Sequence, residues 1–141
     1  MTAKILDGKA MAQQVRQQLA AKVAENQTEA FLAVVLVGDD EASKIYDRNK
    51  KKAANEIGMC CEILEFSASI GENALLEVIE GLNADPHVSG ILVQLPLPEH
   101  INPLKVLSKI NPEKDVDGFS PYNAGLLACK EPSAVVAATP K

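Results

Sequence analysis

The spacing of apolar residues predicts a helix near the start of the chain, followed by a buried strand. Apolar side chains recur every four residues at Met11, Val15, Leu19 and Val23. This is the spacing of one face of an amphipathic surface helix, and Asp7 can cap its first turn. The valine-rich apolar run over residues 31–37 then ends at Gly38. Such an unbroken run is typical of a strand that is buried on both faces.

Further strands and helices are predicted downstream. The next helix carries Tyr46 and Lys50 and is expected to end at Gly58, because glycine tolerates the positive φ of a residue that follows a helix. Residues 60–66 and 90–94 have strand patterns. Between these strands, Ser69 and Glu72 have capping-box spacing ahead of an apolar helical pattern. A further short helix is expected before residue 114.

The alternation of strands and helices predicts an α/β fold. We expect a three-layer domain over residues 1–141, with a mainly parallel sheet flanked by helices. Ligands of such sheets bind beyond the carboxyl ends of the strands. Three segments can reach that edge: Gly38 to Asp40, Gln94 to Pro98, and Lys114 to Gly118.

Composition narrows the function classes. The 141 residues are 47% hydrophobic, which is typical of a globular domain, and no apolar run approaches the ~20 residues that span a bilayer. The net charge of −5 disfavours nucleic-acid binding and favours a small ligand. The N-terminus lacks an apolar signal segment, so a cytoplasmic location is expected.

No metal site is predicted. The three cysteines, Cys60, Cys61 and Cys129, include no CxxC pair, and an odd set of this kind suits neither a disulfide framework nor zinc. Neither His87 nor His100 has a partner at ligand spacing. We therefore expect reduced cysteines and structural or surface histidines.

The candidate chemistry lies on the second helix. At 100° per residue, Ser43, Tyr46 and Lys50 fall on one side, which Ala53 and Ile57 continue. Lys50 is thus the lysine that points where the apolar residues point, and a cation turned inward beside a tyrosine is a candidate catalytic group. The alternative is a tyrosine that packs its ring while the lysine extends outward to solvent.

Four segments in this order closely resemble one family, the methylenetetrahydrofolate dehydrogenase/methenyltetrahydrofolate cyclohydrolases. They are Leu32 to Asp40, the set Ser43, Tyr46 and Lys50, the string Gly90 to Pro98 (GILVQLPLP), and Lys114 to Phe119 (KDVDGF). The resemblance extends from Ile5 to Gly125. It implies one-carbon metabolism that serves purine biosynthesis. Family members oxidise 5,10-methylenetetrahydrofolate with NADP or NAD and hydrolyse the methenyl product to 10-formyltetrahydrofolate.

The resemblance also implies roles for the site residues. Lys50 would help water to add to the methenyl carbon and would move protons as the ring opens. Such acid–base work near neutral pH needs a lowered lysine pKa, which burial favours. Gln94 would bind and orient Lys50, and the ring of Tyr46 would pack against the folate. Val93 and Leu95 would contribute to the substrate site.

The pterin anchor implied by the resemblance is Asp117. A carboxylate can accept two hydrogen bonds from the 2-amino and N3–H edge of a pterin. Asp115 lies two residues earlier and would face the same way in an extended segment, so the residues alone do not separate the two, and both could be ordinary turn acids. Ser43 also fits the family pattern, although its hydroxyl could equally bond to the local backbone.

The other cations of this helix, Lys44, Arg48, Lys51 and Lys52, crowd its outer side. They could meet the polyglutamate tail of a folate, but a solvated face is the plainer interpretation.

The end of the chain departs from the family pattern. The family continues into a Rossmann-type NAD(P)-binding domain, into which residues 126–141 would lead, and no glycine-rich pyrophosphate turn occurs in this chain. Leu126 replaces a family arginine, and Ala138 replaces a family cysteine. We expect the chain to be the folate-binding fragment of the bifunctional enzyme.

This departure limits the activity and the assembly that we expect. The fragment should have weak cyclohydrolase activity at most, because family members form one wall of the folate cleft from a segment beyond residue 141, and a more open cleft admits water. It should show no NADP-dependent oxidation, because it has no recognisable nucleotide site. The alternatives are a non-catalytic folate-binding module and an interaction module. The family is homodimeric, and a monomer is compatible with this fragment.

Overall fold

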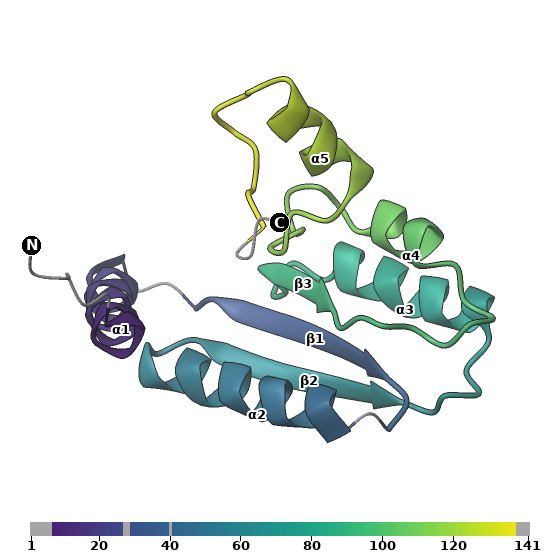
Figure 1. The fold of residues 1–141 in the computed structure, drawn as a ribbon, viewed down its shortest axis with the longest axis horizontal. Helices are drawn as coiled ribbons and strands as arrows, with labels where there is room; N and C mark the ends of the chain where they lie inside the picture. The colour runs from purple at the N-terminus through teal and green to yellow at the C-terminus, as the bar shows by residue number, and fades with distance from the viewer. Residues whose placement is uncertain (1–6, 27–28, 40, 138–141) are drawn as a thin grey trace, which may run out of the picture.

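The chain folds into a three-stranded sheet and five helices in the computed structural model, which describes residues 7–26, 29–39 and 41–137 (Figure 1). Within the second helix, the side chains of residues 41–45 and 47 are outside this description. The elements in chain order are α1 (Gly8–Asn26), β1 (Phe31–Val37), α2 (Glu41–Glu56), β2 (Cys60–Phe66), α3 (Glu72–Ala84), β3 (Gly90–Val93), α4 (Pro103–Lys109) and α5 (Pro121–Ala128). The predicted α/β class is confirmed.

The sheet is parallel throughout, with strand order β2-β1-β3. The central strand β1 pairs Val34 with Ile63 of β2 on one side and with Leu92 of β3 on the other. Beyond β3, a single parallel bridge joins Ile91 to Asp115, and the Ile91 N–H donates to the Lys114 carbonyl at 2.8 Å. The segment that carries the KDVDGF string is therefore attached directly to the sheet.

Alternation along β1 divides the core between two faces. Ala33, Val35 and Val37 belong to the larger apolar cluster, to which α3 contributes Leu75 and Ile79. The even-numbered Val34 packs on the other face with Ala54 of α2 and Cys61 of β2. Figure 1 accordingly shows α2 on one side of the sheet and α3 and α4 on the other. The prediction that β1 is buried on both faces is confirmed.

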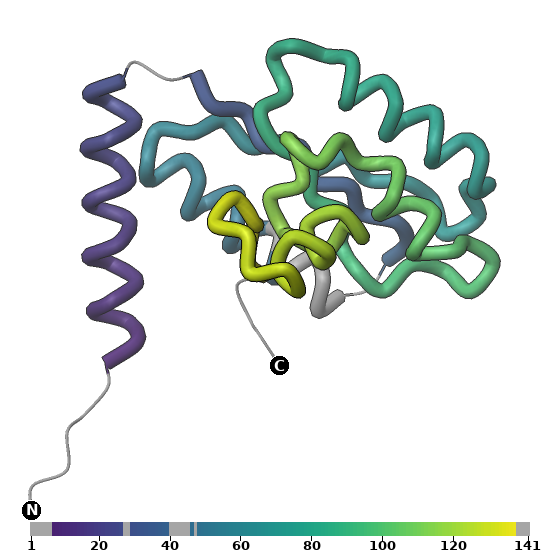
Figure 2. The backbone as a smooth tube through the Cα atoms, turned by 90° about the horizontal axis from the view of Figure 1, so that it is seen from above, coloured from purple at the N-terminus to yellow at the C-terminus, as the bar shows by residue number. Residues whose placement is uncertain are grey.

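The first helix forms as predicted, but its apolar face is largely uncovered by the described residues. Asp7 caps α1, since its Oδ1 accepts a hydrogen bond from the Ala10 N–H at 3.0 Å. The helix stands beside the sheet (Figure 2), and Arg16 pairs with Glu56 of α2 at 3.2 Å. Three of the four apolar positions of the predicted stripe are exposed, namely Met11, Val15 and Leu19.

Two local predictions need correction. The capping box at Ser69 and Glu72 is wrong, because α3 has Gly71 as its N-cap and no side chain caps it. The Glu72 carboxylate instead accepts hydrogen bonds from the Asn102 N–H at 2.8 Å and from Lys105 Nζ at 2.5 Å. These partners lie about thirty residues away, so a local pattern could not reveal them. Helix α5, which Ser120 caps, was not predicted at all.

Candidate functional site

The centre of the candidate site is a contact between α2 and the end of β3. Lys50 Nζ donates a hydrogen bond to Oε1 of Gln94. The glutamine is fixed at both ends, since its backbone N–H donates to the Val35 carbonyl at 2.9 Å and its Nε2 donates to the Leu95 carbonyl at 3.1 Å. This orientation leaves the amide oxygen turned to the lysine, so the half-buried Lys50 is held at the carboxyl edge of the sheet.

Asp117 lies within the electrostatic reach of this lysine. Burial raises the pKa of the Asp117 carboxyl, the positive charge of Lys50 acts in the opposite direction, and Asp115 adds to the rise, so the net pKa is above its usual value. Among the residues that the structure describes, none donates a hydrogen bond to this carboxyl group. It is a half-buried acid beside the Lys50–Gln94 pair.

Asp115 is a different kind of residue, although it is only two positions away. It is 2% exposed, and its Oδ1 accepts a hydrogen bond from the Gly118 N–H at 3.0 Å. Its Oδ2 accepts hydrogen bonds from the Ser120 N–H at 2.9 Å and from Asn123 Nδ2 at 2.8 Å. Burial raises the pKa of Asp115, but hydrogen bonds from the side chains of Ser120 and Asn123 and from the backbone N–H groups of Ser120 and Phe119 outweigh it and hold the pKa below its usual value. The structure thus separates the two aspartates that the sequence left open: Asp115 holds its own loop together.

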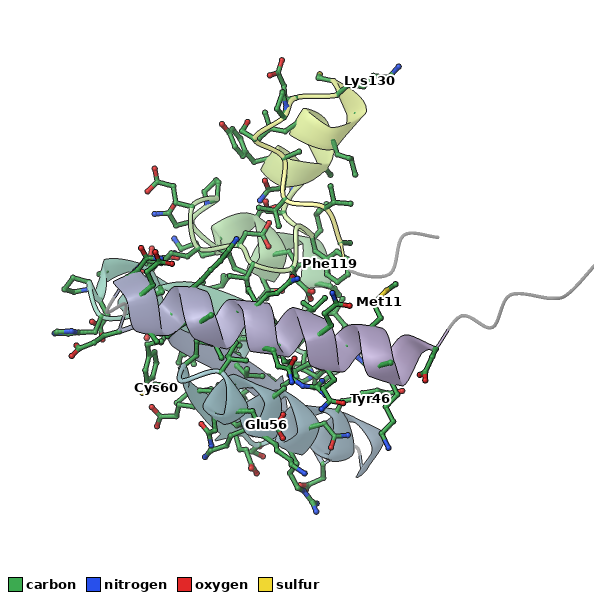
Figure 3. All side chains as sticks on the ribbon, turned by 90° about the vertical axis from the view of Figure 1, so that its left-hand side faces the viewer. Met11, Tyr46, Glu56, Cys60, Phe119 and Lys130 are labelled. Carbon is green, nitrogen blue, oxygen red and sulfur yellow. The ribbon has the colours of Figure 1, made fainter. Side chains whose placement is uncertain are left out.

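Tyr46 does not turn inward as the helical pattern predicted. It is 64% exposed and lies at the surface of α2 (Figure 3). The buried line along this helix passes through Ala54, which packs against the sheet two turns later. Because α2 begins just beyond the carboxyl end of β1, its first turns lie at the edge of the sheet, where less of the fold covers them. The ring of Tyr46 is therefore open to a ligand at this edge.

The other predicted site residues are placed as follows. The side chain of Val93 is 3% exposed and belongs to the core, so only its main chain is available to a ligand. Leu95 is half-buried, and its carbonyl is the one that Gln94 engages. The side chains of Ser43 and Lys44 lie outside the described residues, as does Ala138, so the predictions for them stay predictions.

The outer face of α2 keeps its solvated character. Arg48, Lys51 and Lys52 are exposed and line a shallow surface pocket with Asn55 and Glu56. The acid within this group offsets part of its positive charge. Of the predicted cations, Lys50 is the one that the structure joins to Gln94.

Sequence reasoning missed the role of Lys114. This lysine anchors the loop over residues 115–120, which carries Asp115 and Asp117 and which we call the aspartate loop. Its Nζ donates hydrogen bonds to three carbonyls at the C-terminal end of α3, those of Leu82 at 3.1 Å, Asn83 at 2.8 Å and Asp85 at 2.7 Å. A lysine is a suitable partner for such carbonyls, because the last turn of a helix leaves them without intrahelical donors. The only signal in the sequence was the lysine itself, since its partners lie about thirty residues earlier.

Gly90, the first residue of β3, has a packing role that its place in the GILVQLPLP string did not reveal. A Cβ atom at this position would lie 2.4 Å from Cγ1 of Val116. The glycine therefore lets the aspartate loop approach β3 closely.

The described residues contain neither a cluster of metal-ligand side chains nor a glycine-rich turn of the kind that holds a dinucleotide. No group of three His, Cys, Asp or Glu side chains among them could hold a metal ion. The turn after β1 has one glycine, Gly38, followed by the acidic Asp39, and a Cβ at Gly38 would make only an ordinary 3.7 Å contact with Ala68. An acidic turn without a glycine cradle does not fit a pyrophosphate.

No helix of the described part is long and apolar enough to cross a bilayer.

Comparisons with known proteins find similar sequences and structures. Residues 6–117 match the family described as tetrahydrofolate dehydrogenase/cyclohydrolase, catalytic domain. A bifunctional methylenetetrahydrofolate dehydrogenase/cyclohydrolase from Campylobacter jejuni is 41% identical with a TM-score of 0.91, over 95% of this chain and 49% of that one. A 5,10-methylenetetrahydrofolate dehydrogenase from the silkworm Bombyx mori is also 41% identical, with a TM-score of 0.92 over 96% of this chain and 48% of that one.

A third relative is the dehydrogenase-cyclohydrolase from Trypanosoma brucei, whose structure was solved with NADP cofactor and inhibitor. It is 34% identical with a TM-score of 0.89, over 96% of this chain and 48% of that one. The chain thus spans about half the length of these relatives.

Proposed function

The chain belongs to the tetrahydrofolate dehydrogenase/cyclohydrolase family, whose catalytic domain it carries, and from this premise we propose that it binds a tetrahydrofolate derivative and hydrolyses 5,10-methenyltetrahydrofolate. The observation that supports the proposal is the hydrogen bond from Lys50 Nζ to Gln94 Oε1, with the carboxyl of Asp117 close enough for the lysine charge to act on it. A proton-transfer group and a pterin acceptor then share one edge of the sheet.

Substrate binding uses Asp117 and Tyr46. The Asp117 carboxylate accepts hydrogen bonds from the 2-amino and N3–H groups of the pterin, as a pair of adjacent donors requires. The exposed ring of Tyr46 provides a flat surface for the aromatic part of the folate. The main chain of Val93 and the half-buried Leu95 lie next to Gln94 and complete this side of the site.

The hydrolytic step uses Lys50. A water oxygen bonds to the methenyl carbon, and the bond from that carbon to N5 breaks to give 10-formyltetrahydrofolate. Of the two protons that the water loses, one is transferred to N5 and the other leaves to solvent. Lys50 is positioned to take and return a proton in this sequence, and Gln94 keeps its Nζ in place.

The oxidative step is assigned to the longer protein. Hydride transfer from 5,10-methylenetetrahydrofolate needs NADP or NAD, and the described residues of this chain do not fit a dinucleotide. We therefore interpret residues 1–141 as the folate-binding catalytic domain, with residues 126–141 leading toward a nucleotide-binding domain.

The proposal also has a cellular part. It includes a cytoplasmic location and a role in purine biosynthesis, for which 10-formyltetrahydrofolate supplies formyl groups. For the isolated chain we propose a monomer, although the family is homodimeric.

The test compares two neighbouring lysines in the purified chain. Loss of 5,10-methenyltetrahydrofolate is followed by absorbance for the wild type, Lys50→Ala and the matched control Lys51→Ala. We expect slow hydrolysis above the buffer rate, abolished by Lys50→Ala and kept by Lys51→Ala, whose side chain is exposed on a different face. Equal rates for the wild type and Lys50→Ala would refute the catalytic assignment, and reduction of NADP by the chain would refute the division between the two steps.

A second candidate function is folate binding without turnover. The observation that favours it is the 64% exposure of Tyr46, because an open cleft admits water and positions substrate poorly. In that case calorimetric titration with 5-formyltetrahydrofolate shows binding that Asp117→Ala weakens, while no variant changes a hydrolysis rate. An interaction module, by contrast, binds no folate in the same titration.

A further inference from the structure

Residues 131–137, which we term the C-terminal strap, pack against the loop that carries Asp117. The link between them is Asn123, which lies in the first turn of α5 and is 2% exposed. Its Nδ2 donates to Oδ2 of Asp115 at 2.8 Å, and its Oδ1 accepts a hydrogen bond from the Val135 N–H at 3.3 Å. One side-chain amide thus joins the aspartate loop to the strap.

A second contact between the same two segments is made by backbone. Gly118 has φ +70°, and a Cβ atom there would lie 2.3 Å from the Val135 carbonyl oxygen. The strap therefore passes directly against the residue that follows Asp117. Only glycine allows both this conformation and this approach.

We propose that Asn123 is a positioning residue for Asp117, and that the strap sets the pose of the pterin anchor through Asn123 and Gly118. The inference rests on the proposed function, since it gives Asp117 the pterin. Asp117 lies between Asp115 and Gly118, and both of these neighbours are held by the Asn123 network. Movement of either neighbour moves the Asp117 carboxyl relative to Lys50.

The physical argument starts from the buried carboxylate of Asp115. It needs donors for both oxygens, because a buried charge without hydrogen bonds is costly. Removing the Asn123 amide takes away one of the donors to this carboxylate, while the N–H and the side chain of Ser120 remain. The loop then shifts to make up for the lost partner, and a bidentate contact with a pterin tolerates little displacement.

A double-mutant cycle tests whether Asn123 acts through Asp117. Dissociation constants for 5-formyltetrahydrofolate are measured by calorimetry for the wild type, Asn123→Ala, Asp117→Ala and the double variant. We expect Asn123→Ala to weaken binding about tenfold in the wild-type background and less than about twofold when Asp117 is already alanine. An equal loss in both backgrounds overturns the proposal, because it is the result of a structural role alone.

A pair of glycine substitutions tests the strap without removing a hydrogen-bonding side chain. Gly118→Ala pushes the loop and the strap apart, whereas Gly125→Ala is the matched control, since a Cβ there would meet nothing within 4 Å. We expect weaker folate binding for the first variant and wild-type binding for the second. Wild-type affinity for a folded Gly118→Ala protein overturns the role of the strap.

Failure of the proposed function gives a different pattern. If the wild-type chain binds no folate, the assignment of Asp117 fails, and the positioning network is decided by amide hydrogen exchange of the unliganded protein. Faster exchange of the Gly118 and Ser120 amides in Asn123→Ala than in Gly125→Ala supports the network. Equal exchange in the two variants overturns it.

Discussion

Lys114 provides the sharpest test of how the aspartate loop is attached to the rest of the fold. We consider Lys114→Met, which keeps an unbranched side chain of similar length and removes the ammonium. The wild-type Nζ serves three carbonyls of the α3 terminus at 2.7–3.1 Å. The carbonyls of Leu82 and Asn83 lose this donor in the variant, whereas the Asp85 carbonyl keeps the Val88 N–H at 3.2 Å. The favourable interaction of a cation with the C-terminal end of the helix is also lost.

The expected cost follows from these contacts. A hydrogen bond that involves a charged group contributes about 1.5–3 kcal/mol. The three bonds here share one ammonium, and the carbonyl of Asp85 lies at an exposed residue where water can replace the lysine. The contributions therefore do not add, and we expect a total loss of about 2 kcal/mol in the free energy of unfolding.

Chemical denaturation of the purified chain measures this loss, and the neighbouring helix supplies a control. Lys109→Met makes the same substitution at a lysine that pairs with Glu80 on the surface. An exposed ion pair contributes about 0–1 kcal/mol, so this variant should remain close to the wild type. If Lys114→Met costs no more than Lys109→Met, the loop does not depend on its anchor, and the reasoning is refuted.

Three further predictions concern the same region. Gly90→Ala should cost about 1–3 kcal/mol in denaturation, because its Cβ would meet Val116 at 2.4 Å, whereas Gly81→Ala, with nothing within 4 Å, should not destabilise the fold. Asp117 has a raised pKa, so its folded form favours the proton, and stability falls as pH rises from the ordinary value of about 3.9 through the folded-state pKa. Asp117→Asn should therefore raise the melting temperature at pH 7 and lose this advantage in acid; a lower melting temperature at pH 7 contradicts this. Asp115 has a lowered pKa, so its contribution is present above the ordinary value and is lost as pH falls through the folded-state pKa; Asp115→Asn should flatten that acid-side decline in a pH series of melts.

The strands were readable from the sequence because their signals are local. The apolar run of β1 ends at Gly38, β2 ends before Ser67, and both strands form over the predicted ranges. The contact of Lys50 with Gln94 was implied by the resemblance to the family, and the structure contains it. The parallel sheet explains how the residues meet, because it brings the end of β3 to the edge where α2 begins.

Predictions failed where distant partners decide the outcome. Glu72 was expected to form a capping box with Ser69, but its carboxylate accepts hydrogen bonds from Asn102 and Lys105 instead. Asp115 and Asp117 have the same chemistry and similar flanks, and the donors that the fold brings to Asp115 from Gly118, Ser120 and Asn123 distinguish them. The exposure of Tyr46 likewise depends on where the sheet ends beneath α2, which helical spacing does not encode.

The bridge between Ile91 and Asp115 has a consequence for the entropy of ligand binding. Because the acidic side of the site is attached to the sheet, its conformational entropy is already lost when the protein folds. On the side that carries Tyr46, the ring is exposed to solvent. If the proposed folate site is correct, its acidic side is preorganised, and most of the ordering that binding requires falls on the side chains of α2.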